Sequence, residues 1–173
     1  MSKRVSLKEF QEGLAARLKA AAGESAPTAR LGFDAAGEHW LARLDSSGEV
    51  LQVPEIQPVP LTRDWFLGVA NIRGALYGVT DFGAFTGQAP TVRGQENRLL
   101  LVGQPFGMNC ALLVSRLTGL RNVSNYEEVE ASGRNAEWST GTWRDRHGQL
   151  WHELDAERLL AQNDFLQISA HQG

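Results

Sequence analysis

The histidines of this 173-residue sequence are the side chains whose spacing comes nearest to a metal site. His152 and Glu153 begin the H-E-x-x-H zinc pattern, but its second histidine is missing. His147 and His152 are five residues apart across a predicted hairpin, and zinc would need further ligands there. Turns and strand faces are the commoner places for histidines such as these and for the remaining two, His39 and His171. We therefore expect no metal site.

The single cysteine and two aspartates could in principle support catalysis. Cys110 lies in an apolar segment, where a buried and unreactive thiol is usual, and a catalytic cysteine needs a neighbouring base. Asp81 and Asp155 could be paired acids, but each follows a predicted hairpin, which favours capping of a following helix. No Gly-x-Ser-x-Gly elbow occurs. We expect no catalytic residue.

The glycine-rich stretch GVANIRGALYGVTDFGAFTG, residues 68–87, could be a phosphate loop or a β-hairpin. Its glycines do not have the Gly-x-Gly-x-x-Gly spacing of dinucleotide-binding loops, and no lysine follows them as the Walker pattern requires. A hairpin fits better, with Arg73 at or beside the turn, where its guanidinium can reach water or a partner. The sequence predicts no cofactor.

Composition narrows the class of protein further. Hydrophobic residues make up 42% of the chain and charged residues 21%, which is typical of a soluble globular protein. The net charge of −3 provides no basic surplus for nucleic acid, and no apolar run is long enough to insert into a membrane. A single cysteine allows no intrachain disulfide and fits a reducing, cytoplasmic location.

Short strands with glycine-rich turns predict a mainly β protein of the barrel or sandwich type. Three hairpins are expected, within residues 31–44, 98–117 and 138–154, in addition to the one in residues 68–81. Pro58 and Pro60 predict an extended segment outside any sheet centre, and the polar residues 121–137 are interpreted as a long loop.

The first 24 residues predict an amphipathic helix. Ser6 and Glu9 have capping-box spacing, and an apolar stripe follows, made by Leu7, Phe10, Leu14 and Leu18. This helix could pack on its own domain, which we favour, or dock in a groove of a partner.

An internal repeat connects the hairpin of residues 68–81 with the one near the C-terminus. Trp65 and Gly68 are followed by Asp81 in the first copy. Trp138 and Gly141 are followed by Asp155 in the second, at nearly the same spacing. A hairpin followed by a short helix, with the aspartate as its N-cap, explains both copies. The repeat predicts two duplicated subdomains, centred roughly on residues 65–87 and 138–160.

Residues 65–82, WFLGVANIRGALYGVTDF, resemble the core motif of the CheW family of bacterial chemotaxis scaffolds. The matching residues are Gly68, Val69, Asn71, Ile72, Arg73, Gly74 and Asp81. GEHWLARL followed by Glu49-Val50 is similar to the first hairpin of the family, and NCALLVSRLTGL, with Arg116, is similar to a later strand pair. The resemblance covers residues 30–160, leaving 161–173 as a C-terminal segment. The N-terminal extension resembles that of family members from type IV pilus systems.

The resemblance implies a fold of two small five-stranded SH3-like barrels packed on a shared core. It implies no enzymatic activity. The partners it implies are the cytoplasmic tip of a methyl-accepting chemoreceptor and the CheW-like regulatory domain of a histidine kinase, in arrays that control twitching motility. The residues expected to bind partners are Glu49, Val50, Val69, Asn71, Ile72, Arg73, Gly74 and Arg116.

Three departures from the family pattern affect these expectations. Gly78 replaces a proline, Ser115 replaces an aspartate, and residues 44–50 are polar where the family is apolar. Two roles stay open for Arg73: contact with a partner through its planar fork, or support of the hairpin through carbonyls or a carboxylate such as Glu49. A small β-barrel enzyme or ligand-binding protein of an unrelated class is the alternative function.

Overall fold

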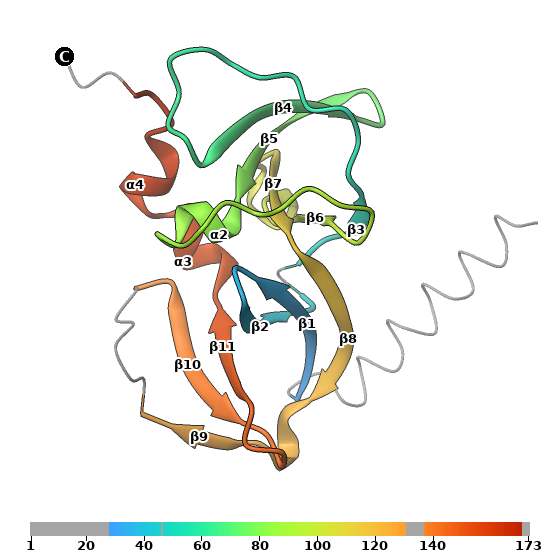
Figure 1. The fold of residues 1–173 in the computed structure, drawn as a ribbon, viewed down its shortest axis with the longest axis vertical. Coiled ribbons are helices and arrows are strands. Elements are labelled where there is room, and N and C mark those ends of the chain that lie inside the picture. Colours follow the sequence, from blue (N-terminus) through green and yellow to red (C-terminus); the bar gives the residue numbers. More distant parts are fainter. Residues whose placement is uncertain (1–27, 46, 131–136, 171–173) are drawn as a thin grey trace, which may run out of the picture.

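The computed structural model describes residues 28–45, 47–130 and 137–170, which form two stacked lobes, each built on one β-sheet (Figure 1). The predicted helix over residues 1–24 lies outside the described residues. In chain order the strands are β1 (Ala29–Ala35), β2 (Glu38–Arg43), β3 (Val50–Gln52), β4 (Phe66–Ile72), β5 (Ala75–Asp81), β6 (Arg98–Leu101), β7 (Cys110–Val114), β8 (Arg116–Asn122), β9 (Glu127–Val129), β10 (Ser139–Arg144) and β11 (Leu150–Leu154). The α-helices are α2 (Phe82–Phe85), α3 (Ala156–Leu160) and α4 (Asn163–Leu166), and the 3₁₀ turns are η1 (Gln104–Phe106) and η2 (Val123–Asn125).

The two sheets share one pairing scheme. The five-stranded sheet has the order β3-β6-β7-β5-β4, with β5 and β7 parallel. The other sheet has the order β8-β1-β2-β11-β10-β9, with β11 and β2 parallel. Every other pair in both sheets is antiparallel. Leaving out β9, the five strands of each sheet therefore correspond one to one.

The repeat seen in the sequence has the same local geometry in both copies. The β4–β5 register shifts between Phe66 and Gly68, and the β10–β11 register shifts between Ser139 and Gly141. Each hairpin leads into a short helix, α2 or α3. The expected capping is confirmed: the Asp81 carboxylate accepts a hydrogen bond from Ala84 N, and that of Asp155 from Arg158 N.

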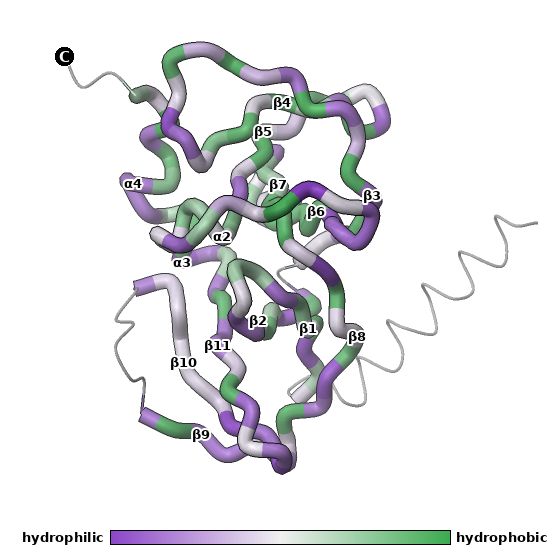
Figure 2. The backbone as a smooth tube through the Cα atoms, in the orientation of Figure 1, coloured by the Kyte–Doolittle hydropathy of each residue, from purple (hydrophilic) through white to green (hydrophobic). Residues whose placement is uncertain are grey.

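A shared core joins the two sheets. Phe33 and Trp40 from β1 and β2 pack with Leu100 and Leu112 from β6 and β7. Phe82, the first residue of α2, lies edge-on to both Phe33 and Trp40, at centroid distances of 5.8 and 4.9 Å. The lobe of the five-stranded sheet is the upper lobe in Figure 1, and that of the six-stranded sheet is the lower lobe. Figure 2 shows hydrophobic residues concentrated where β5, β6 and β7 meet, in keeping with a second cluster inside the upper lobe. Burial of these side chains is the main stabilising contribution.

The prediction of a mainly β fold and the predicted hairpins are confirmed, with two corrections. One sheet has six strands instead of five, and the segment interpreted as a long loop contains η2 and β9. Strand β9 is acidic and has weak β propensity, but it pairs with β10, with Val129 opposite Thr142. Tertiary pairing therefore overrides the local preference of this segment.

Candidate partner-binding surface

The tip of the β4–β5 hairpin is a two-residue turn made by Arg73 and Gly74. Their φ angles are 53° and 84°, and two successive positive φ values are the mark of the type I′ turn that suits a twisted hairpin. The side-chain oxygen of Asn71 accepts a hydrogen bond from Gly74 N at 2.9 Å. Glycine adopts this backbone region freely, whereas arginine is disfavoured in it. The Asn-Ile-Arg-Gly block thus holds an arginine in a strained conformation at an exposed point.

The Arg73 guanidinium forms a two-pronged ion pair with the Glu49 carboxylate. Nη1 donates to Oε2 at 2.6 Å, and Nη2 donates to Oε1. Hydrogen bonding to Glu49, followed by the charge of Glu49, raises the pKa of Arg73. The Arg73 side chain is 71% exposed. Exposed ion pairs add little to stability, so the main effect of this one is to orient the guanidinium.

This ion pair connects the two edges of the five-stranded sheet. Glu49 immediately precedes β3, and Arg73 immediately follows β4, which are the two edge strands. Farther along, Gln57 and Val69 exchange two backbone hydrogen bonds of 2.7 and 2.9 Å. Gly68 permits this approach, because a β-carbon at that position would lie 2.0 Å from the carbonyl oxygen of Gln57. The edges of the sheet are thereby drawn together, as in a small barrel.

The other predicted residues of this region divide by exposure. Asn71 and Gly74 are exposed beside Arg73, and a β-carbon added at Gly74 would meet open space. Val50 and Val69 are half-buried, on the two edge strands. Ile72 is buried in the core of the upper lobe. The structure therefore brings Glu49, Asn71, Arg73 and Gly74 together at the tip, whereas Ile72 supports it from inside.

Leu76 is a member of this surface that the sequence reasoning missed. It pairs with Asn71 across the hairpin, and 63% of the residue is exposed. The alternation of side chains along a strand could have identified it. Tyr77 and Val79 face the core, so Leu76 faces the opposite side of β5. An exposed leucine beside an arginine offers a partner both apolar area and charge.

Arg116 belongs to the other sheet and to a separate charge cluster. Its Nε donates to Asp34 Oδ2 at 2.7 Å, and Asp34 Oδ1 lies 2.6 Å from His39 Nδ1. Asp34 is buried, and each of its carboxylate oxygens has a polar partner, as is usual for buried polar groups. The Arg116 side chain is 55% exposed. None of its hydrogen bonds or ion pairs to described residues involves the Arg73 tip.

The residues weighed for catalysis or metal binding have structural contacts. His152 Nδ1 lies 3.3 Å from Thr142 Oγ1, and His147 Nε2 lies 3.2 Å from Arg146 Nε. Burial raises the pKa of the Cys110 thiol, which keeps it protonated and weakly nucleophilic. Over the described ranges, no three His, Cys, Asp or Glu residues cluster as metal ligands would, and none of the helices could cross a bilayer.

Comparison with known proteins places this geometry in context. The family model for the CheW-like domain matches residues 30–164. Protein PilI of Pseudomonas aeruginosa is 29% identical over 92 residues, which are 53% of this chain and 51% of PilI. The match thus spans about half the length of that curated relative. The fold is similar to the crystal structure of scaffolding protein TtCheW from Thermoanaerobacter tengcongensis, with a TM-score of 0.63 and 17% identity over 73% of this chain and 88% of that one.

Proposed function

Because the chain belongs to the CheW-like domain family, we propose that it is a non-enzymatic scaffold joining the cytoplasmic tip of a chemoreceptor to the CheW-like domain of a histidine kinase. A scaffold in chemosensory signalling is what the family assignment supports. The control of type IV pilus twitching is a finer part of the proposal. It rests on the sequence resemblance to pilus-linked members and on the match to PilI. The site of action proposed is the cytoplasmic face of receptor arrays.

The observation that carries the proposal is the Arg73 tip. A disfavoured φ of 53° and an ion pair to Glu49 hold a largely exposed guanidinium in one orientation. Stability alone gives no reason to place arginine in this turn, because glycine or asparagine suits it better. Strained residues held by their surroundings are characteristic of functional sites. We therefore assign Arg73 to partner contact, with Glu49 as the residue that orients it.

Binding alone performs this function. Glu49 accepts one hydrogen bond from each terminal nitrogen of Arg73. The remaining N–H groups of the guanidinium can donate to a carboxylate or carbonyl of a partner. Asn71 and Leu76 extend the contact on the same hairpin. The lower lobe, with Arg116 on β8, offers a surface for another partner. A rigid two-lobed body that holds two partners makes kinase control depend on receptor geometry.

The test uses the receptor and kinase that co-purify with the chain from native cells. Receptor affinity of the Arg73→Ala variant should fall roughly tenfold or more, as for loss of a charge-assisted hydrogen bond. Arg73→Lys keeps the charge, loses the fork and should lie between. Arg146→Ala, at the turn of the β10–β11 hairpin, is the matched control and should bind as wild type.

The outcomes separate the proposal from its alternatives. Wild-type affinities for both receptor and kinase in Arg73→Ala would remove Arg73 from the binding surface. Co-purification of the wild-type chain with neither a receptor nor a histidine kinase would overturn the scaffold function. A large fall of the melting temperature in Arg73→Ala would assign the residue to the fold instead.

A further inference from the structure

A cavity of about 410 Å³ opens where the helices of the two lobes meet, away from the Arg73 turn. Its lining is aromatic on one side, made by Trp65, Phe85 and Trp138, and polar elsewhere. The ring of Phe85 is edge-on to Trp65 at a centroid distance of 5.1 Å and tilted by 45° against Trp138 at 6.1 Å. Rings in contact at these angles form one apolar wall, against which a planar apolar group can pack.

The repeat explains why two tryptophans meet here. Trp65 and Trp138 stand at equivalent positions before the two hairpins, and their backbone carbonyls accept equivalent hydrogen bonds, from Asp81 N at 2.8 Å and Asp155 N at 2.9 Å. Each copy thus fixes its tryptophan to its own capping aspartate. The two copies face each other across the cavity, which neither copy could form alone.

Several polar groups of this cavity lack partners. Trp138 is only 8% exposed, and its indole N–H, which has no acceptor among the described residues, is not one of the buried unpartnered atoms and is therefore open to solvent. The half-buried Trp65 likewise has no acceptor for its indole N–H there. Arg63 donates through Nε to Gln167 O at 3.1 Å, while its two terminal nitrogens have no acceptor within the described part of the chain. The exposed Asp164 also lines the cavity and has no ion pair or hydrogen bond with the described residues.

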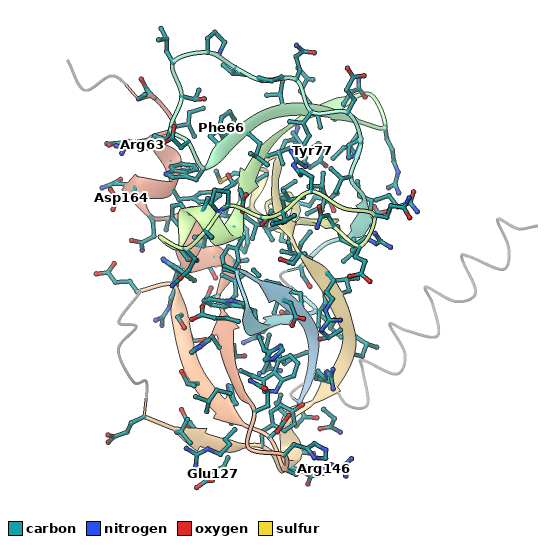
Figure 3. All side chains as sticks on the ribbon, viewed as in Figure 1. Arg63, Phe66, Tyr77, Glu127, Arg146 and Asp164 are labelled. Carbon is teal, nitrogen blue, oxygen red and sulfur yellow. The ribbon has the colours of Figure 1, made fainter. Side chains whose placement is uncertain are left out.

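We propose that this cavity binds a small aromatic zwitterion with the chemistry of an aromatic α-amino acid. The ring packs against the wall formed by the two tryptophans and Phe85. The carboxylate accepts from the Arg63 fork and an indole N–H, and the ammonium group donates to Asp164. Figure 3 shows the Arg63 and Asp164 side chains on the same side of the molecule, from the loop before β4 and from α4. The volume lies in the usual range of about 300–1,000 Å³ for ligand sites.

The indole N–H signals of the five tryptophans report directly on this site in a ¹H–¹⁵N correlation spectrum of the full chain. Titration with L-phenylalanine should shift the signals of Trp65 and Trp138 and leave the other three unchanged. Phenethylamine, which lacks the carboxylate, and 3-phenylpropionate, which lacks the ammonium group, should each bind at least about tenfold more weakly. The variants Trp65→Phe and Trp138→Phe assign the two signals.

Variants then test each half of the proposal. Arg63→Gln should reduce the affinity for L-phenylalanine to that for phenethylamine and leave phenethylamine binding unchanged. Asp164→Asn should do the same relative to 3-phenylpropionate. Arg146→Gln, at the opposite end of the molecule, is the matched control and should have no effect (Figure 3). Absence of shifts up to the solubility limit, equal shifts of all five signals, or equal affinities for the three compounds would each overturn the proposal.

Discussion

The β4–β5–α2 unit and the β10–β11–α3 unit have the same construction on both sides of their turns and differ at the turns themselves. Both carry a register shift at a glycine and a parallel partner strand, and both end in an aspartate that caps a helix. The first turn consists of Arg73 and Gly74 and is tied to Glu49, in another strand connection. The second turn is tied within itself, because Asp145 accepts hydrogen bonds from His147 N and Gln149 N.

This difference separates what the fold requires from what is specific to one copy. Features present twice serve the hairpin–helix architecture, because both lobes need them. Features present once, at the β4–β5 tip, are the strained arginine and the link to the other sheet edge. We therefore expect substitutions of shared features to affect stability, and substitutions at the Arg73 tip to affect binding.

The largest expected effect on stability distinguishes the two glycines at the register shifts, Gly68 and Gly141. Gly68 has a φ of 130°, and a β-carbon there would lie 2.0 Å from the Gln57 carbonyl oxygen. At Gly141 the nearest atom, Trp143 Nε1, would be 3.4 Å away. Gly68→Ala should lower the free energy of unfolding by about 4 kcal/mol, whereas Gly141→Ala should change it by less than about 1 kcal/mol. Urea unfolding measures both, and similar losses would contradict the role given to Gln57.

The capping aspartates should differ by less. Asp81 is buried and accepts from Ala84 N at 3.2 Å, Thr91 N at 2.8 Å and Thr91 Oγ1 at 2.8 Å. Asp155 accepts from Arg158 N at 3.0 Å and is partly exposed. Asp81→Ala should lower the unfolding free energy by about 3 kcal/mol, because buried donors lose their acceptor, and Asp155→Ala by about 1 kcal/mol. Equal losses, measured by denaturant unfolding, would mean that Thr91 finds another partner.

How far the sequence predicts this molecule depends on how local each feature is. The hairpins, their turn glycines and the two caps follow from residues within a few positions of each other. The parallel pairing of β5 with β7, and the pairing of β9 with β10, follow from long-range contacts that local patterns do not encode. At the candidate site, Glu49 was one of the possible partners of Arg73. The approach of Gln57 to Gly68 depends on how the edges of the sheet meet and leaves no local signal.

Replacing Arg73 by glycine should separate stability from binding. Glycine adopts the φ of 53° without strain, and the lost ion pair is exposed, so the melting temperature should stay within about 2 °C of wild type or rise slightly. Receptor affinity should fall as it does in Arg73→Ala. His147→Gly at the other turn is the control and should leave affinity unchanged. A melting temperature well below that of wild type would show that the Glu49 link holds the lobe together.

The smallest effect concerns the second turn and appears only in acid. Burial acts to raise the pKa of Asp145, but hydrogen bonds from Trp151 Nε1, Gln149 N and His147 N outweigh it, so the pKa lies below its ordinary value. A carboxyl whose pKa is lowered by folding stabilises the folded state above the unfolded-state pKa of about 3.9, and this contribution is lost as the pH falls through the folded-state pKa. Asp145→Asn should therefore be less stable than wild type at neutral pH, and the difference should shrink below about pH 4. Urea unfolding across this pH range checks it. A constant difference would mean that the geometry of the acceptor, and not its charge, stabilises the self-contained turn.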